Sequence, residues 1–296
     1  MTAAPGVHGR DVGHRTTVPR LGRAVAVFVG VTFGFSWLIS LPLVLAPPLT
    51  VMPWYFYLGE LGPAVGAVAA TLVLRPTGGL NGWARRTFSF TGIGRALIVA
   101  VVSLILYLGI GLVVEQLTEG SLDRLPLIGL TSKLPGIPAI VVLLIWVLTS
   151  GLGEETGWRG WLMPTLTGRF GFISAALVVA AVWMLWHVPQ FLFNPGFRGM
   201  GWAAIGWALA LVAGSFWLGW LARLGRWSII PVVLWHGGFD LITSGDLGPA
   251  SLPATVSTIV IVQALVVVAI LIVRGERRGR LAHTDRRDAP GDAANR

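Results

Sequence analysis

The stretch ALIVAVVSLILYLGIGLVV, residues 96–114, contains no charged side chain and no proline. An α-helix needs about 20 predominantly apolar residues to cross the hydrocarbon core of a bilayer. An uninterrupted apolar run of this length is therefore typical of a membrane-spanning helix rather than of a strand or a soluble amphipathic helix. We predict that this segment crosses a membrane.

The rest of the chain is also predominantly apolar. Hydrophobic residues make up 54% and charged residues 12% of the 296 residues, whereas a soluble domain carries roughly 25% charged residues. The apolar runs are 24–46, 54–74, 96–114, 136–163, 172–193, 202–222, 228–243 and 254–273. We predict an all-α polytopic membrane protein, with a bundle of about eight transmembrane helices over residues 23–275 between disordered tails at 1–22 and 276–296.

The distribution of charge predicts the orientation. The 22 basic and 13 acidic residues give a net charge of +9, which in a soluble protein would suggest a nucleic-acid partner. With eight spans, however, 18 of the 22 basic residues lie in tails and short loops on the side of the two termini, and only Arg124, Lys133 and Arg198 lie on the other. By the positive-inside rule we expect a multi-pass protein of the cell membrane with both termini cytoplasmic and no nucleic-acid partner.

Six ionisable side chains fall inside or at the edge of the predicted spans. They are Glu60, Glu154, Glu155, His187, His236 and Asp240. A charge at mid-bilayer costs from ~2.5 to ~10 kcal/mol or more, so each such residue is a candidate for a functional site. All except Glu60 cluster in the fourth, fifth and seventh spans, which predicts one site built from these three helices.

Helical spacing predicts which of these side chains share a face. Glu155 and Arg159 are four residues apart, so Arg159 can neutralise Glu155. Glu154 points about 100° away from Glu155 and is free to act as a base or a metal ligand.

The fifth and seventh spans repeat the four-residue spacing. Trp183 lies one turn before His187, and Pro189 is expected to break or kink that helix. His236 and Asp240 are also one turn apart, and this pair alone could be a structural His–Asp hydrogen bond.

Two kinds of chemistry fit these residues. A carboxylate in a low-dielectric cavity can take a proton from water while imidazoles orient that water or donate to an oxyanion, which would hydrolyse a peptide without a covalent nucleophile. The same residues, Glu154, His187, His236 and Asp240, could instead bind Zn²⁺. The chain contains no Cys, no H-E-x-x-H and no G-x-S-x-G motif, which argues against thiol catalysis, a zincin and a serine hydrolase.

Depth in the membrane presents one difficulty. At 1.5 Å per residue, Glu154 and His236 lie roughly 12 to 14 Å from the inner ends of their predicted spans, whereas His187 lies roughly 22 Å from the start of the fifth span. We therefore expect that the fifth span starts outside the bilayer, tilts, or kinks at Pro189.

Three motifs occur in order, Glu154-Glu155-x-x-x-Arg159, Trp183-x-x-x-His187 and His236-x-x-x-Asp240. They resemble the first, second and third motifs of the CPBP intramembrane proteases, the CAAX prenyl protease and bacteriocin-processing family, also called Abi. The segment that carries this resemblance runs from about residue 136 to 243. The resemblance implies a membrane-embedded endopeptidase. It assigns Glu154 as the base that activates water, with His187 holding that water or a metal. His236 and Asp240 would stabilise the oxyanion or complete a ligand set, supported by Glu155 and Arg159.

The chain departs from the family pattern at two positions. The second motif commonly begins with Phe, and here it begins with Trp183. The third commonly ends in Asn, and here it ends in Asp240, which can donate a hydrogen bond to an oxyanion only when protonated. This favours a metal-ligand or His-orienting role for Asp240.

The residues leave two other function classes open. A transporter could use the same carboxylates and His as a proton relay, although no internal repeat supports it. A non-catalytic membrane scaffold could retain the same residues. For the protease, we expect a peptide or protein substrate that arrives from the cytoplasmic side.

Overall fold

The structure is a computed structural model that describes residues 18–46 and 51–288, with side chains described for 20–46 and 51–274. Every regular element in these residues is helical. The elements are α1 Val18–Leu45, α2 Phe56–Gly59, α3 Gly62–Leu74, α4 Gly79–Thr87, α5 Gly94–Glu119, η1 Leu125–Leu127, α6 Ala139–Trp146, η2 Val147–Glu154, α7 Glu155–Gly157, η3 Trp158–Leu162, α8 Met163–Phe170, α9 Phe172–Trp186, α10 Gln190–Phe193, α11 Pro195–Arg198, α12 Ala203–Leu224, α13 Ile230–Thr243 and α14 Leu252–Asp288.

Seven helical segments of the described chain are long and apolar enough to cross a membrane. The all-α polytopic fold is therefore confirmed. The seventh predicted span, 228–243, forms α13, an apolar helix of 14 residues. At 1.5 Å per residue it is about 21 Å long, which is shorter than a hydrocarbon core of about 30 Å. Neighbouring helices cover most of α13, which packs against η2, α5 and α6.

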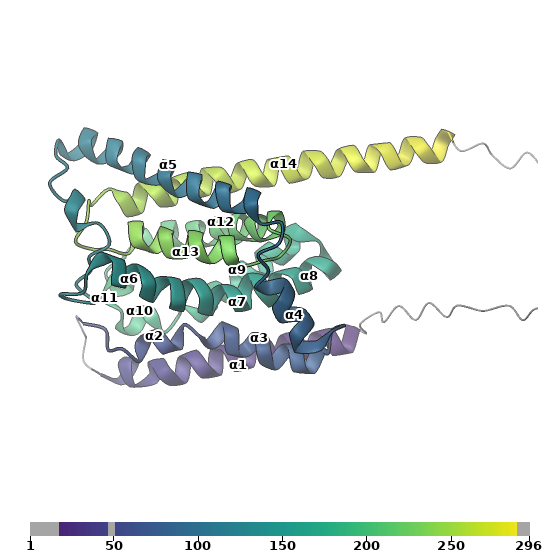
Figure 1. Cartoon of the computed structure of the whole chain (residues 1–296), viewed down its shortest axis with the longest axis horizontal. Coiled ribbons are helices and arrows are strands. Elements are labelled where there is room, and N and C mark those ends of the chain that lie inside the picture. Colours follow the sequence, from purple (N-terminus) through teal and green to yellow (C-terminus); the bar gives the residue numbers. More distant parts are fainter. Residues whose placement is uncertain (1–17, 47–50, 289–296) are drawn as a thin grey trace, which may run out of the picture.

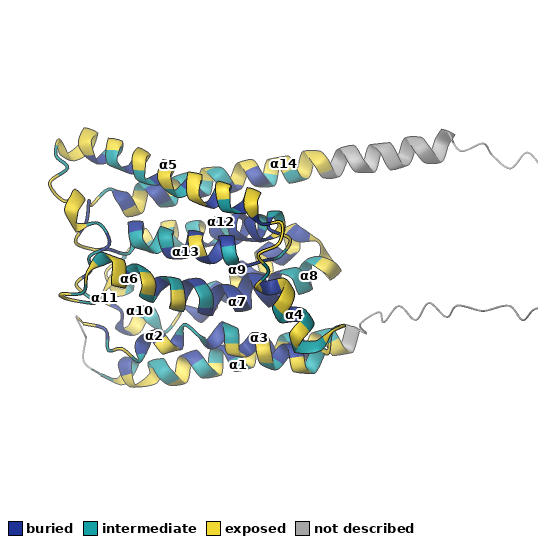
Figure 2. Ribbon diagram, viewed as in Figure 1, coloured by how far each residue is buried: buried dark blue, intermediate teal, exposed yellow. Residues whose placement is uncertain are grey.

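The helices lie roughly parallel, with α1 and α3 at one edge and α5 and α14 at the other (Figure 1). The elements α6, η2, α7 and α13 lie between these edges, and α9 and α12 lie behind them. Buried residues concentrate in the middle of the bundle, whereas exposed residues follow the outer sides of α1, α5 and α14 (Figure 2). Those outer sides carry exposed apolar side chains such as Leu38, Ile105 and Leu265, as expected for helices that face lipid tails.

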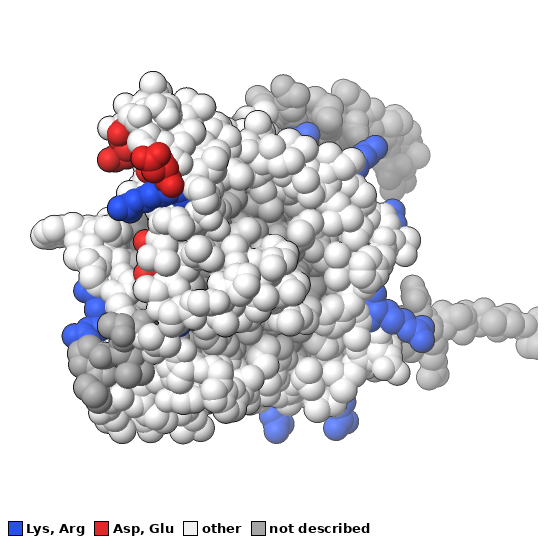
Figure 3. All heavy atoms as spheres, turned by 60° about the vertical axis from the view of Figure 1, so that its left-hand side comes forward, with Lys and Arg blue, Asp and Glu red and all other residues white. Residues whose placement is uncertain are grey.

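Charged side chains lie at the rims of the bundle, and a broad uncharged surface separates them (Figure 3). The loops around α4, between α8 and α9, and between α12 and α13 lie at the same end of the bundle as the described chain ends (Figure 1). In and beside these loops lie seven of the described arginines, including Arg85, Arg169 and Arg223. The predicted division of basic residues between the two ends is thus a property of the folded chain, while its direction across the membrane stays a prediction.

Two boundaries differ from those predicted. The fourth span runs Ala139–Phe170 and does not end at residue 163, because Met163 and Pro164 begin α8, which continues the same rod. Pro at this position lies in the first turn of α8, where its missing N–H costs little. The last helix runs to Asp288, into the segment 276–296 predicted as a tail. The predicted tail 1–22 lies mostly outside the described residues.

Candidate active site

The first motif lies where the fourth span changes its helical geometry. The segments η2 and η3 are π-helices, and the single α-helical turn α7 joins them. Widened turns of this kind are frequent at functional sites. The carbonyl oxygen of Gly160, inside η3, accepts hydrogen bonds from Trp83 Nε1 at 2.9 Å, Arg86 Nη2 at 2.8 Å and Thr87 Oγ1 at 3.4 Å. The interfacial helix α4 thereby anchors the widened segment.

Glu155 is the centre of a buried ionic cluster. Its Oε1 accepts hydrogen bonds from Arg159 Nη1 at 2.9 Å and from His236 Nδ1 at 2.8 Å. Glu155 and Arg159 are both fully buried, and the guanidinium lies 4.3 Å from the centre of the Trp183 ring. The predicted Glu155–Arg159 pair is therefore formed, and it also joins the first motif to the third.

Glu154 has different partners. Its Oε2 accepts hydrogen bonds from two indole nitrogens, Trp158 Nε1 at 3.0 Å and Trp183 Nε1 at 2.6 Å. Its Oε1 accepts none from the described side chains. Two neutral donors hold this carboxylate in position without neutralising its charge. Trp183, which stands where the resembled motif commonly has Phe, supplies one of these donors, a hydrogen bond that the sequence analysis did not predict.

His187 lies directly after the end of α9. Its Nδ1 lies 2.8 Å from the Trp183 carbonyl oxygen. A carbonyl oxygen can only accept, so Nδ1 carries the proton and Nε2 of the neutral ring is an acceptor. The ring also lies against Trp186 and stacks on Phe197. Pro189 precedes α10, so the predicted break in this span is confirmed.

The two site residues of the seventh predicted span have different hydrogen-bond partners. His236 bonds to Glu155, and Asp240 Oδ2 accepts a hydrogen bond from Ser150 Oγ at 2.7 Å. A His236–Asp240 hydrogen bond is not formed, although the two are one turn apart in α13. Both contacts run to the fourth span, since Ser150 belongs to η2.

The longer fourth span resolves the difficulty of depth. Glu154 lies 16 residues before Phe170, and His187 lies 15 residues after Phe172. The two helices meet there as an antiparallel hairpin, so the two residues lie at the same level. The apparent mismatch of about 10 Å came from ending the fourth span too early.

The zinc site was predicted from Glu154, His187, His236 and Asp240. Among the described residues, no group of three or more His, Cys, Asp or Glu is arranged to hold a metal ion. His236 Nδ1 and one oxygen each of Glu154 and Asp240 already have protein partners. As the side chains are placed, they do not fit a zinc-binding set, and zinc stays a prediction.

Glu60, which the sequence analysis left outside the site, lies beside it. Its carbonyl oxygen packs against Gly153, where an added Cβ would lie 2.7 Å away. The side chain is within electrostatic range of Glu154, Asp240 and His236. Its one sequence signal was its position inside an apolar span. The packing of α3 on η2 and α7 brings it to the first motif.

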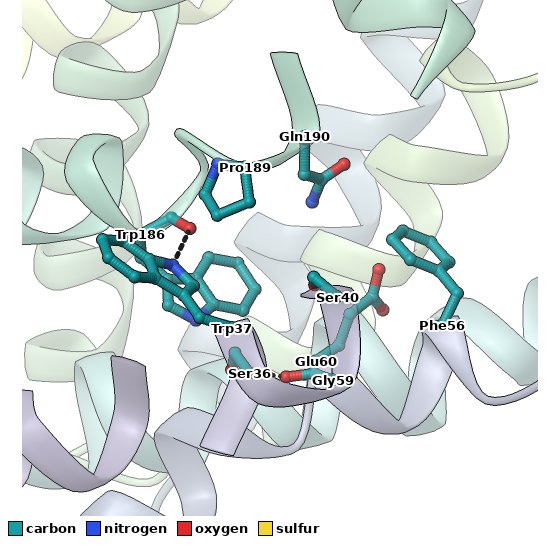
Figure 4. A pocket seen from close by; sticks show the side chains of 9 residues that line it. All are labelled: Ser36, Trp37, Ser40, Phe56, Gly59, Glu60, Trp186, Pro189 and Gln190. Carbon is teal, nitrogen blue, oxygen red and sulfur yellow. Dashed lines mark hydrogen bonds between the residues drawn. The ribbon is translucent and has the colours of Figure 1, made fainter. Parts of the chain in front are cut away.

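A small hollow opens on the other side of Glu60 (Figure 4). The residues that line it are Ser36, Trp37, Ser40, Phe56, Gly59, Glu60, Trp186, Pro189 and Gln190. Trp37 Nε1 donates a hydrogen bond of 3.1 Å to the Trp186 carbonyl oxygen at one edge of the hollow. The last three lining residues flank His187, so the hollow adjoins both the first and the second motif.

Comparison with known proteins points to the same segment. Residues 136–242 match the family model described as type II CAAX prenyl endopeptidase Rce1-like. The protein named CAAX prenyl protease 2 of Methanococcus maripaludis is 27% identical over 101 residues, which are 32% of this chain and 37% of that protein. The match thus spans little more than a third of the length of that relative. All three motifs lie inside residues 136–242, so the matched segment supports the resemblance to the CPBP family.

Proposed function

We propose that the chain is an intramembrane endopeptidase that hydrolyses a peptide bond with a water activated by Glu154. The observation that carries the proposal is the difference between the two adjacent glutamates. Glu155 is bonded to Arg159 and His236, whereas Glu154 is held only by neutral indole N–H groups. A charged carboxylate without a cationic partner inside a membrane is costly and is typical of a functional group.

In this mechanism Glu154 takes a proton from water as the water oxygen attacks the peptide carbonyl carbon. The C–N bond then breaks, and the same proton passes to the leaving nitrogen. His187 Nε2, an acceptor, orients the attacking water. His236, whose Nδ1–H is held by Glu155, donates from Nε2–H to the developing oxyanion when its ring is doubly protonated. Asp240 and Arg159 act through the residues that they position.

The test compares hydrolysis by purified full-length protein and its variants. The probes are fluorogenic peptides that end in a CAAX sequence, one prenylated and one not. Glu154→Gln should lower the rate by roughly 100-fold or more, the usual contribution of a general base. Glu119→Gln, an exposed carboxylate at the end of α5, is the matched control and should hydrolyse at the wild-type rate.

Two outcomes would overturn parts of the proposal. Near-normal hydrolysis by Glu154→Gln would show that another group is the base. Equal rates for wild type, Glu154→Gln and Glu155→Gln would remove the protease proposal itself. Incubation with EDTA, followed by addition of Zn²⁺, tests the metal separately. Loss of activity with EDTA and its recovery with Zn²⁺ would require a metal-ligand set that the present side-chain positions do not form.

The proposal also covers the membrane location of the protein and the side from which the substrate approaches. We place the protein in the cell membrane with both termini cytoplasmic, on the basis of its basic residues. The predicted approach of the substrate from the cytoplasmic side is a separate matter, because α2 and α10, which contribute lining residues to the hollow, lie toward the end of the bundle opposite the described chain ends (Figure 1). The opposite face is therefore a second route to be tested with a substrate added to one side of sealed vesicles.

A further inference from the structure

Intramembrane hydrolysis requires water at a site that the helices enclose. The hollow beside Glu60 adjoins the segments that carry the motifs, and it is large enough to hold a water molecule. A buried water needs two to four polar partners, and an apolar cavity of the same size stays dry. The polarity of the lining therefore decides what the hollow contains.

Three lining side chains have free hydrogen-bonding groups. Glu60 Oε2 is buried without a partner among the described residues. Gln190 uses its amide oxygen to accept from Asn194 Nδ2 at 2.9 Å, which leaves its amide nitrogen as a donor. The Ser40 hydroxyl forms no hydrogen bond with the described residues. Figure 4 shows the Gln190 nitrogen directed toward Ser40 and Glu60.

These groups form a complete set for one water. Gln190 donates, Glu60 accepts, and Ser40 does either. A carboxylate oxygen left unpartnered in a buried site would carry the full cost of desolvation, so a bound water also explains how Glu60 is tolerated. Ser36 is not part of the set, because its hydroxyl already donates to the Gly59 carbonyl oxygen at 2.6 Å.

We propose that this hollow holds the water that replenishes the hydrolytic water, and that Glu60 is the positioning residue that retains it. The inference rests on the proposed function of Glu154. Glu60 abuts Gly153, the residue before the base, and Trp186, Pro189 and Gln190 surround the turn that carries His187. The hollow therefore adjoins both the segment that carries Glu154 and the turn that carries His187.

The test has one arm that does not depend on hydrolysis. In X-ray radiolytic footprinting, water beside a buried side chain labels it with hydroxyl radicals. Phe56 and Trp186 line the hollow and are 7% and 4% exposed. We expect both to be labelled in the full-length protein. Trp161, which is 1% exposed and does not line the hollow, is the internal control and should stay unlabelled.

Variants test whether the water in the hollow is needed for turnover. Glu60→Leu should lower the labelling of Phe56 and Trp186 and reduce kcat about tenfold with KM little changed, the effect of one charge-assisted hydrogen bond. Glu60→Gln keeps a hydrogen-bond acceptor, so it should retain most of the labelling and most of kcat. Gln190→Leu removes the donor and should act in the same direction as Glu60→Leu, so the test survives if either leucine variant fails to fold.

Unlabelled Phe56 and Trp186 in the wild type would overturn the inference, because the hollow would be dry. Normal labelling together with a normal kcat in Glu60→Leu would equally overturn it. If instead the wild type hydrolyses no peptide but both side chains are labelled in a Glu60-dependent way, the water site stands and the proposed function fails.

Discussion

Replacing Gly157 by Ala tests whether the first motif depends on close contact between α7 and α3. A Cβ at Gly157 would lie 2.4 Å from Pro63 Cβ and 2.5 Å from the Pro63 carbonyl oxygen. Carbon atoms in contact are about 3.5 to 4.0 Å apart, so the two helices must separate by about 1 Å. Neither obstacle can rotate away, because one is a proline ring and the other is backbone.

The expected loss of stability follows from two opposing contributions. Overpacking of a rigid contact costs ~1–3 kcal/mol, and this site belongs at the upper end of that range. Ala gains about 1 kcal/mol over Gly in a helix. The net destabilisation should be about 2 kcal/mol. The effect on hydrolysis should be larger, because a displacement of about 1 Å at a catalytic group can cost about 100-fold.

The measurement is reversible unfolding in detergent, combined with hydrolysis of the prenylated CAAX peptide. Gly168→Ala in α8 is the matched control, since an added Cβ there meets no atom within 4 Å. It should be as stable as wild type or up to about 1 kcal/mol more stable. The reasoning is refuted if Gly157→Ala unfolds at the same denaturant concentration as Gly168→Ala.

Three further predictions concern the buried cluster and the orientation. Arg159→Ala should destabilise the protein by about 3–5 kcal/mol in detergent unfolding, because it leaves Glu155 without its cation; an unchanged midpoint would contradict this. Trp183→Phe keeps the ring but removes a donor to Glu154, so kcat should fall about tenfold while the unfolding midpoint hardly moves, and unaltered turnover would show that this hydrogen bond is dispensable. A reporter fused after the C-terminus should be cytoplasmic and one inserted near Asp123 should be outside; a C-terminal reporter on the outside would reverse the topology.

The sequence was sufficient where local geometry decides the outcome. The apolar runs identified the helices, and the four-residue spacing of Glu155 and Arg159 placed their side chains in contact. The helix break at Pro189 followed from its missing N–H. These features depend on residues within one or two turns of each other, and neighbouring helices do not alter them.

The sequence was insufficient where partners come from other helices. The spacing of His236 and Asp240 suggested a mutual bond, but Glu155 and Ser150 are better placed acceptor and donor on the facing helix. Glu60 is distant from the motifs in sequence and reaches them only through helix packing. The sequence analysis ended the fourth span at residue 163, whereas Pro164 lies in the first turn of α8 and does not interrupt the rod.

The shared oxygen of Glu155 has a consequence for how this segment can change over generations. Arg159, in the same helix, and His236, 81 residues further along the chain than Glu155, both bond to that single atom. A replacement at either position alters the environment of the other, so the effects of the two replacements are not additive. A first motif grafted from a relative is therefore expected to function only when the third motif of that relative is grafted with it.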